Sequence, residues 1–253
     1  MTYDKFYAWV LAEIGLDLTA YKQSQLIRRI ESLVTRAKKK SIYEYQKLLE
    51  ENIVERNKFI DFITINVTEF FRNAELFAEL ENLLKTEYFS KKKNIKVWSA
   101  ACSLGCEPYS IAMMFKENGF ENYTIYATDV DSTILSKAKE GIYTETEIKN
   151  MPIKYLKYFK KIKNKYILSD EIKAMVKFKK SDLILDRYER GFDLILCRNV
   201  VIYFNVDIKE KIYKKFSLSL NNNGILFVGA TESIYNSELY GFKKSSTFIY
   251  RKL

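Results

Sequence analysis

The first third of the chain has apolar residues at helical spacing. They recur every three or four positions over residues 3–14, and Gly15 follows, which predicts an amphipathic helix that ends there. The same spacing continues over residues 18–40, 42–62 and 69–89. We therefore predict a helical N-terminal domain over residues 1–75 and a connecting helix over residues 76–90.

From residue 91 the pattern changes to short apolar runs that alternate with helical stretches. The predicted strands are IKVWSA (95–100), YTIYATDV (123–130), FDLILC (192–197), GILFVGA (224–230) and TFIYRKL (247–253). The predicted helices cover residues 107–118, 131–140 and 207–220. This alternation indicates an α/β domain over residues 91–253, with helices on both faces of a parallel sheet. The last two strands are expected to pair antiparallel at its edge.

A lysine-rich stretch, residues 154–180, interrupts this alternation. It contains the runs KYILSD and MVKFKK. We expect these two runs to pair as a hairpin in a small β-subdomain.

The composition of the chain excludes some kinds of catalysis, but it does not identify a binding partner. The 253 residues include 42 Lys and Arg against 32 Asp and Glu, a net charge of +10, and no histidine. A basic surface attracts nucleic acid, anionic lipid or acidic protein, and composition does not choose among them. The lack of histidine excludes imidazole bases, ligands and triads. Because the chain also lacks a CxxC pair, we expect no metal site.

The expected location is the cytoplasm. Three cysteines suit a reducing compartment. The N-terminal MTYDKFYAWVLAEIG mixes acidic residues into its apolar run, which is not typical of a signal peptide. No apolar run approaches the ~20 residues of a membrane span, so we expect no membrane insertion.

Polar residues follow three of the predicted strands. The turn SAACSLGCEPYS (99–110) carries Gly105 and Glu107, with Pro108 at an expected first helical position; Asp129 and the pair Arg198–Asn199 end the other two strands. Ligands of open α/β sheets bind at the carboxyl ends of the strands, and Asp129 is spaced from the turn like a ribose-binding carboxylate. Alternatively the turn is only a connection, Asp131 or Ser132 caps a helix, and the Arg-Asn pair lies on the surface.

Six segments resemble one family, the chemotaxis receptor glutamate methyltransferases (CheR). They are TINVTEFFRN, VWSAACSLGCEPYSIAM, ATDVDSTIL, GIYTETEIKNMPIKYLKYF, LCRNVVIYF and GILFVGATESI, in order over residues 64–234. The resemblance implies a Rossmann-like domain that binds S-adenosylmethionine (SAM), methylates glutamates of chemoreceptors and releases S-adenosylhomocysteine. This agrees with the composition, because a carboxylate of pKa about 4.3 needs no general base at neutral pH and a sulfonium methyl needs no metal.

The resemblance also implies roles for individual residues. Cofactor contacts are expected from Asn66, Thr68, Arg72, Gly105, Glu107, Asp129, Asp182, Leu183, Arg198 and Asn199. Arg72 and Tyr203 are expected near the reacting atoms, whereas Phe70 and Phe71 are expected in the core. From the residues alone, NVTE is also a helix-capping box, and Tyr203 is also a core tyrosine.

Some positions depart from the family pattern. Ala101, Leu104 and Cys106 replace the more usual Gly, Thr and Glu, and Asp182 stands where many members have Asn. Alanine fits a tight turn at position 101 only if φ stays negative there.

One face of the second helical stretch is basic. Lys22, Arg29 and Arg36 recur every seven residues, with Arg28 beside them. The resemblance implies docking to the helical bundle of a chemoreceptor; otherwise this is a solvated face. Some members also hold a receptor pentapeptide through a glycine-containing loop. The chain has no glycine between Gly141 and Gly191, so we expect no need for that tether.

Two other functions fit parts of the sequence. A non-catalytic module that senses SAM or S-adenosylhomocysteine, or that binds receptors, would tolerate the altered loop. A nucleic-acid methyltransferase would suit the +10 charge, but the two prolines, 108 and 152, form no Asn/Asp-Pro-Pro-aromatic motif. We expect no nucleic-acid partner.

Overall fold

The computed structural model describes residues 2–88 and 94–253. They form two compact units, Met1–Asn66 with Tyr203–Lys209, and Val67–Ile202 with Glu210–Leu253. The division after Asn66 falls earlier than the boundary expected near residue 75. The expected end of the connecting helix and start of the second domain, residues 89–93, lie outside the described residues.

The first unit is built mainly from helices. They are α1 (Tyr3–Ile14), η1 (Leu18–Ala20), α2 (Gln23–Arg36), α3 (Ile42–Glu51) and α4 (Ile53–Thr64). Gly15 ends α1 with φ 79°, as predicted. The single helical stretch expected over residues 42–62 is two helices, because the Asn52 side chain accepts hydrogen bonds from the backbone N–H groups of Val54 and Glu55 and begins a new helix.

Residues Tyr203–Lys209, here called the strap, return to this first unit from the second half of the sequence. The Lys22 N–H donates to the Tyr203 carbonyl at 2.9 Å, and the Asn205 N–H donates to the Ala20 carbonyl at 2.9 Å. The ring of Phe204 packs edge-on against Tyr21, with centroids 5.1 Å apart. The strap is therefore bonded into the helical unit through both backbone and side chain.

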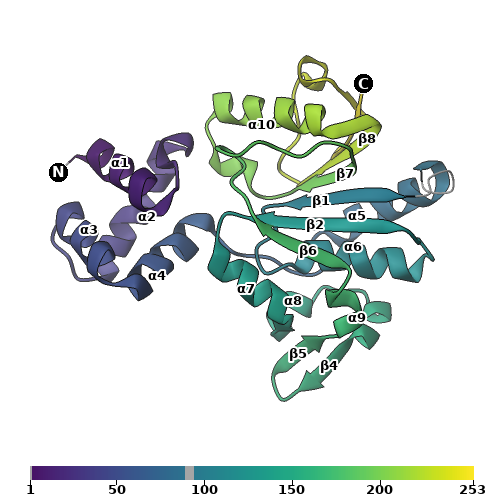
Figure 1. The fold of residues 1–253 in the computed structure, drawn as a ribbon, viewed down its shortest axis with the longest axis horizontal. Helices are drawn as coiled ribbons and strands as arrows, with labels where there is room; N and C mark the ends of the chain where they lie inside the picture. The colour runs from purple at the N-terminus through teal and green to yellow at the C-terminus, as the bar shows by residue number, and fades with distance from the viewer. Residues whose placement is uncertain (1, 89–93) are drawn as a thin grey trace. The chain divides into compact units, whose positions relative to one another are not determined.

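A seven-stranded sheet forms the centre of the second unit (Figure 1), in the order β6-β2-β1-β7-β8-β10-β9. Its strands are β1 (Ile95–Ala100), β2 (Tyr123–Asp129), β6 (Val176–Lys180), β7 (Phe192–Cys197), β8 (Leu220–Val228), β9 (Phe242–Lys244) and β10 (Ile249–Lys252). The five strands from β6 to β8 are parallel. The antiparallel pairing of β10 with β8 is as predicted, whereas β6 was not expected in this sheet.

Helices cover both faces of this sheet. Those with the longest spans are α5 (Ala74–Leu83), α6 (Cys106–Glu117), α7 (Ser132–Glu140) and α10 (Val206–Ser219). Val97 shares one buried cluster with Ile111 of α6, whereas the next residue, Trp98, packs on Phe216 of α10 with ring centroids 5.4 Å apart. Neighbouring residues of a strand point to opposite faces, so α6 and α10 lie on opposite sides. Phe70 and Phe71 are buried in the core, as predicted.

The lysine-rich insertion forms a separate sheet in the order β3-β5-β4, from β3 (Ile142–Tyr143), β4 (Phe159–Ile162) and β5 (Lys165–Leu168). Short helical turns flank its strands: α8 (Glu145–Ile148), η4 (Ile153–Tyr158) and α9 (Asp170–Lys173). A hairpin forms in this insertion, but the predicted pairing of KYILSD with MVKFKK is wrong. KYIL pairs with FKKI, whereas VKFKK runs parallel to β2 at the edge of the large sheet, because its alternating apolar residues Val176 and Phe178 fit there.

Candidate functional site

The carboxyl ends of three neighbouring strands form one polar site, here called the strand-end site. It comprises the turn after β1, Asp129 and Arg198. Ala100 at the end of β1 lies level with Thr128 of β2 and Cys197 of β7. The residues that follow, Asp129 and Arg198, therefore flank the turn after β1. The second unit thus brings this turn, Asp129 and Arg198 to one edge of the sheet, as predicted from the strand ends.

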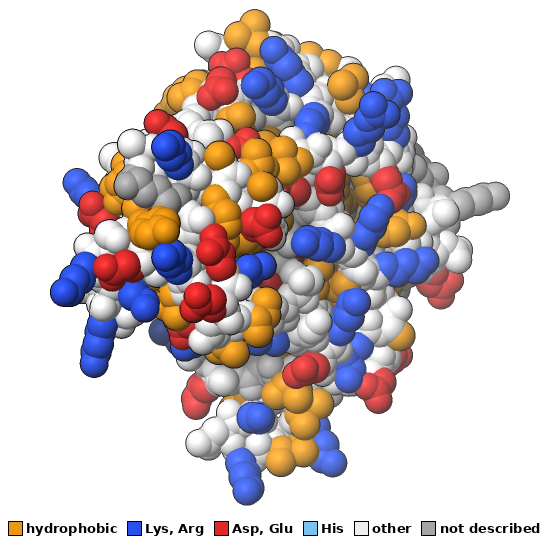
Figure 2. Space-filling view, turned by 60° about the vertical axis from the view of Figure 1, so that its left-hand side comes forward, with side chains coloured by type: hydrophobic (Ala, Val, Ile, Leu, Met, Phe, Trp, Pro, Cys, Tyr) orange, Lys and Arg blue, Asp and Glu red, His pale blue; other side chains and the backbone are white. Residues whose placement is uncertain are grey.

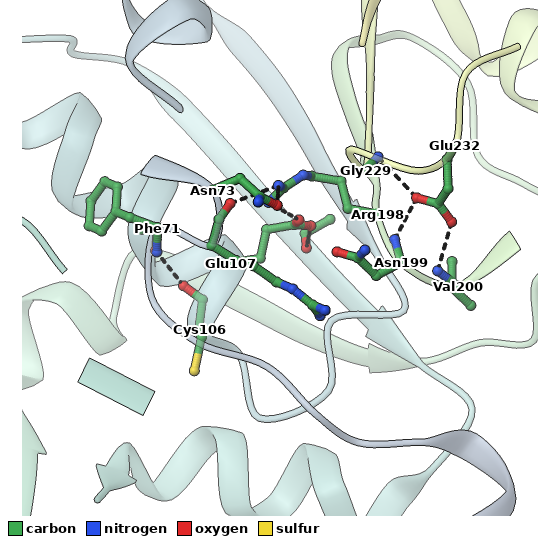
Figure 3. A network of polar contacts seen from close by, with 12 residues as sticks. Phe71, Asn73, Cys106, Glu107, Arg198, Asn199, Val200, Gly229 and Glu232 are labelled. Carbon is green, nitrogen blue, oxygen red and sulfur yellow. Dashed lines mark hydrogen bonds and ion pairs between the residues drawn. The ribbon is translucent and has the colours of Figure 1, made fainter. Parts of the chain in front are cut away.

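Arg198 lies at the centre of a buried network (Figure 3). Its guanidinium donates to the Arg72 carbonyl at 2.7 Å and to Asn73 Oδ1 at 3.2 Å. It lies 3.7 Å from a Glu107 carboxylate oxygen, and its side chain is 2% exposed. It also stacks over the rings of Phe77 and Phe227, at 5.1 and 4.8 Å. The Arg198 side chain is therefore buried, and the alternative that the Arg-Asn pair lies on the surface is wrong for Arg198.

Glu107 is the acidic partner of this cation. The Ser99 hydroxyl donates to its Oε1 at 2.7 Å. Burial raises the pKa of Glu107, while Arg198 and Ser99 favour the ionised form and limit the rise. The pair gives the site a fixed negative and a fixed positive group side by side.

Asp129 holds the turn after β1. Its carboxylate accepts the Ser103 N–H at 2.8 Å and the Asp131 N–H at 3.1 Å. Burial raises its pKa from 3.8 to about 6. Asp131, not Ser132, caps α7 by accepting from the N–H groups of Thr133 and Ile134. The two aspartates have separate roles, and the cap does not compete with Asp129.

The turn itself depends on unusual backbone angles. Gly105 has φ 80°, and a Cβ there would lie 3.1 Å from both Phe178 and Tyr109, so glycine is required. Ala101 has φ 59°, whereas the sequence argument tolerated alanine only at negative φ. Helix α6 begins at Cys106, which makes Pro108 the third helical residue and not the first.

Glu232 supports the neighbouring loop, and the sequence reasoning did not single it out. Its buried carboxylate accepts the N–H groups of Asn199 at 2.5 Å, Val200 at 2.9 Å and Gly229 at 2.9 Å (Figure 3). A Cβ at Gly229 would lie 2.5 Å from this carboxylate, so glycine allows the close approach. The motif GATES carried the resemblance, but nothing in its spacing shows that its glutamate binds the backbone of residues 199 and 200.

The segment that contains Thr68 and Arg72 does not cap a helix. Residues 66–69 have no regular structure, and α5 begins at Ala74 without a side-chain cap, so the capping-box interpretation is wrong. The Arg72 guanidinium donates to the Val67 carbonyl at 3.2 Å, and Thr68 forms a side-chain hydrogen bond with Cys106. Asn66 falls in the first unit and donates to the Thr64 hydroxyl at 3.1 Å.

Asp182 stabilises its own turn. Its Oδ1 accepts the N–H groups of Ile184 at 2.6 Å and Leu185 at 3.2 Å, and Leu183 is buried. Burial raises the pKa of Asp182. This geometry fixes the backbone at residues 182–185; a contact with adenine stays a prediction.

Tyr203, Lys22 and the arginines of α2 belong to the first unit. Tyr203, Lys22, Arg28 and Arg29 line a cavity of about 390 Å³ with apolar walls from Leu26 and Ile63. Arg28 is exposed, whereas Arg29 is partly buried and donates to the Phe62 carbonyl.

The predicted basic face is only partly continuous. Arg29 and Arg36 both stack over the Phe62 ring, at 4.6 and 5.0 Å, but Arg36 does not line the cavity. The partly buried Tyr203 is not a core tyrosine.

Two buried polar atoms of the strand-end site have no hydrogen-bond partner among the described residues. They are Ser103 Oγ, beside Asp129, and Arg198 Nε, beside Glu107. The Arg198 Nε–H can donate to a ligand carboxylate, and the Ser103 hydroxyl can pair with a ligand hydroxyl. SAM carries both kinds of group. Within the described ranges no helix has the length and apolar character to cross a membrane, and no cluster of His, Cys, Asp or Glu could hold a metal ion.

This sheet, its antiparallel edge and its polar strand-end site define the class of Rossmann-like methyltransferases. The family model "CheR methyltransferase, SAM binding domain" matches residues 66–249, and "CheR methyltransferase, all-alpha domain" matches residues 1–64. The chain belongs to the CheR methyltransferase family. It is a SAM-dependent methyltransferase, so the predicted family, fold class, enzyme class and cofactor are confirmed.

Curated relatives agree along nearly the whole chain. A chemotaxis protein methyltransferase of Listeria monocytogenes is 38% identical over 247 residues, 96% of this chain and 94% of the relative. That of Escherichia coli is 33% identical over 240 residues, 88% of this chain and 81% of the relative. A solved glycopeptide N-methyltransferase is similar over 64% of this chain and 50% of its own, with a TM-score of 0.40 and 11% identity.

Proposed function

We propose that this chain transfers the methyl group of SAM to glutamate side chains of chemoreceptors and so forms glutamyl methyl esters. The observation that supports a chemoreceptor substrate is the cavity of the first unit. Its three cations, Lys22, Arg28 and Arg29, and the Tyr203 phenol suit an acidic helix surface. The relatives named chemotaxis protein methyltransferase support the same substrate. The first unit is then the receptor-docking domain.

The residues of the strand-end site fit the polar groups of the cofactor. We assign the ribose hydroxyls to Asp129, the methionyl ammonium to Glu107, and its carboxylate to Arg198 or Arg72. Gly105 lets the backbone of the turn approach closely, and the fixed charges favour one orientation. When bound, SAM supplies a methyl group on a sulfonium, which is already activated for displacement.

The chain's own task at the reacting atoms is alignment. A glutamate of pKa about 4.3 is ionised at neutral pH, so no residue has to remove a proton. This suits a chain without histidine. Arg72 orients the incoming carboxylate, and Tyr203 positions it while water is excluded. We place the enzyme in the cytoplasm, where receptor bundles present their glutamates, without dependence on a pentapeptide tether.

The test is transfer of a tritiated methyl group from SAM to receptor-containing membranes, scored as base-labile radioactivity. Base lability identifies esters and separates them from N-methylation. Arg72→Ala should lower ester formation tenfold or more, whereas the exposed control Arg190→Ala should retain it. Base-stable label in nucleic acid or lysine would refute the substrate, and SAM binding without transfer would support a sensing module instead.

A further inference from the structure

The small sheet of the insertion has two chemically different faces. Directly opposed residues of antiparallel strands share a face, and neighbours along a strand alternate. Phe159 and its partner Leu168 therefore point the same way, and they pack inward: Leu168 is buried and Phe159 stacks edge-on with Phe70 at 5.1 Å. The opposite side is here called the outer face. Its residues are Ile142, Lys160, Ile162, Lys165 and Ile167.

The outer face combines exposed apolar and cationic side chains. Ile142 is 41% exposed and Ile162 is 44% exposed, and both lysines are exposed. At the lower end of Figure 2, where hairpin β4–β5 lies in Figure 1, hydrophobic and basic side chains lie next to one another.

The surrounding sequence concentrates positive charge. Residues 148–169 contain seven lysines and no acidic residue, in a chain whose net charge is +10. Lys154 and Lys157 pair with Glu81 at 3.8 Å and Glu117 at 2.7 Å. Lys160, Lys163 and Lys165 take part in no ion pair with the described residues. The unpaired charge is thus concentrated at the hairpin and its outer face.

The kinds of residue on the outer face favour a fluid anionic surface over a folded partner. A specific polypeptide is usually held by aromatic anchors and arginine forks, and the five residues of the outer face include neither an aromatic residue nor an arginine. Lysines act as point charges that attract anionic headgroups, each by about a factor of five in binding. Isoleucines between them can enter the boundary between headgroups and acyl chains.

We propose that the outer face binds the surface of a bilayer rich in anionic lipid. The contact is peripheral: it requires no spanning segment, and it is independent of the proposed methyl transfer. It keeps the enzyme in the plane of membrane-anchored proteins by charge and a shallow apolar contact.

The test is cosedimentation of the full chain with vesicles of phosphatidylcholine alone, or with about one third phosphatidylglycerol. Binding should require the anionic lipid and weaken with salt. The variant Lys160→Glu/Lys163→Glu/Lys165→Glu should bind at least about a hundredfold more weakly, because loss of three lysines alone gives that factor and the glutamates add repulsion. Ile162→Ser should weaken binding without a change in charge.

The matched control is Lys214→Glu/Lys243→Glu/Lys244→Glu, which alters three exposed lysines elsewhere and gives the same net charge. It should retain most of the binding. Equal losses in both variants, or binding to a receptor fragment but not to vesicles, would overturn the proposal. SAM affinity measured by calorimetry should be unchanged in every variant, which separates this result from misfolding and from failure of the proposed function.

Discussion

Several residues around the strand-end site have left-handed backbone angles. Ala101, Ser103 and Asn199 have φ of 59°, 51° and 60°, and Phe71 and Asn73 have φ of 51° and 60°. For an L-residue other than glycine this region costs about 1–2 kcal/mol. Such strain persists only where the surrounding structure fixes it. Here Arg198 binds residues 72 and 73, and Asp129 binds the turn at Ser103.

Ala101→Gly should therefore stabilise the protein. Relief of the left-handed angle outweighs the greater freedom of glycine in the unfolded chain, so we expect the free energy of unfolding to rise by about 0.5–1 kcal/mol. Denaturant unfolding measures it. The control Ala112→Gly, inside α6, should lower it by about 1 kcal/mol; equal losses in both variants would show that Ala101 is not strained.

The raised pKa of Asp129, about 6, predicts opposite pH effects on stability and on binding. Between its ordinary value of 3.8 and about 6, the folded protein keeps a proton that the unfolded chain has released. This group's contribution to stability is thus full below about pH 4 and is lost as pH rises through 6. Cofactor binding needs the ionised acceptor, so it should strengthen over the same range.

Calorimetry with SAM between pH 5 and 8 checks this. Affinity should fall about tenfold for each pH unit below 6. Asp129→Asn should bind more weakly throughout and lose the part of the pH dependence that is centred near pH 6. A wild-type affinity that stays flat from pH 5 to 7 would remove Asp129 from the ribose site.

At the scale of elements, one carboxylate holds the loop between β7 and the strap. Glu232 accepts three backbone N–H groups, so Glu232→Gln places an amide donor against them and leaves part of the set unpaired. We expect a loss of about 1–3 kcal/mol in unfolding free energy and weaker SAM binding through Arg198. The exposed control Glu238→Gln should change neither; an unaltered SAM affinity in Glu232→Gln would make the role purely structural.

Elements with a strong local signal were predictable from the sequence. The helix 3–14 and the strands 95–100 and 192–197 occur with the predicted bounds, because their apolar spacing alone decides them. The partner of VKFKK was not predictable, since a short alternating strand fits either sheet and tertiary contacts decide. Strand β9 has three residues, too few to show a pattern.

The candidate site shows the same division. The strand ends predicted that Arg198 and Asp129 would lie at one edge of the sheet, because parallel topology requires it. Glu232 could not be found, because its partners are backbone N–H groups, which every residue type supplies. The positive φ at Ala101 was also hidden, since alanine gives no sign of a left-handed turn.

At the scale of the whole molecule, the chain passes between its two units at residues 66–67, 202–203 and 209–210. The first unit is therefore discontinuous in sequence. The strap supplies the partner of the Lys22 N–H, and Asn205 donates to the carbonyls of Ala20 and Thr19. Residues 1–66 alone would lose these bonds and expose the face of Tyr21 that Phe204 covers.

The strap limits how this protein can be recombined with its relatives. A chimera that takes residues 1–66 from the Listeria monocytogenes relative joins a foreign helical unit to a native strap, whereas exchange of residues 203–209 as well restores a matched pair. We expect the double exchange to melt at a higher temperature than the single one, in thermal unfolding followed by circular dichroism. Equal melting would show that the strap is interchangeable. If the double exchange melts higher, residues 1–66 and the strap must be substituted together, although 136 residues separate them in the sequence.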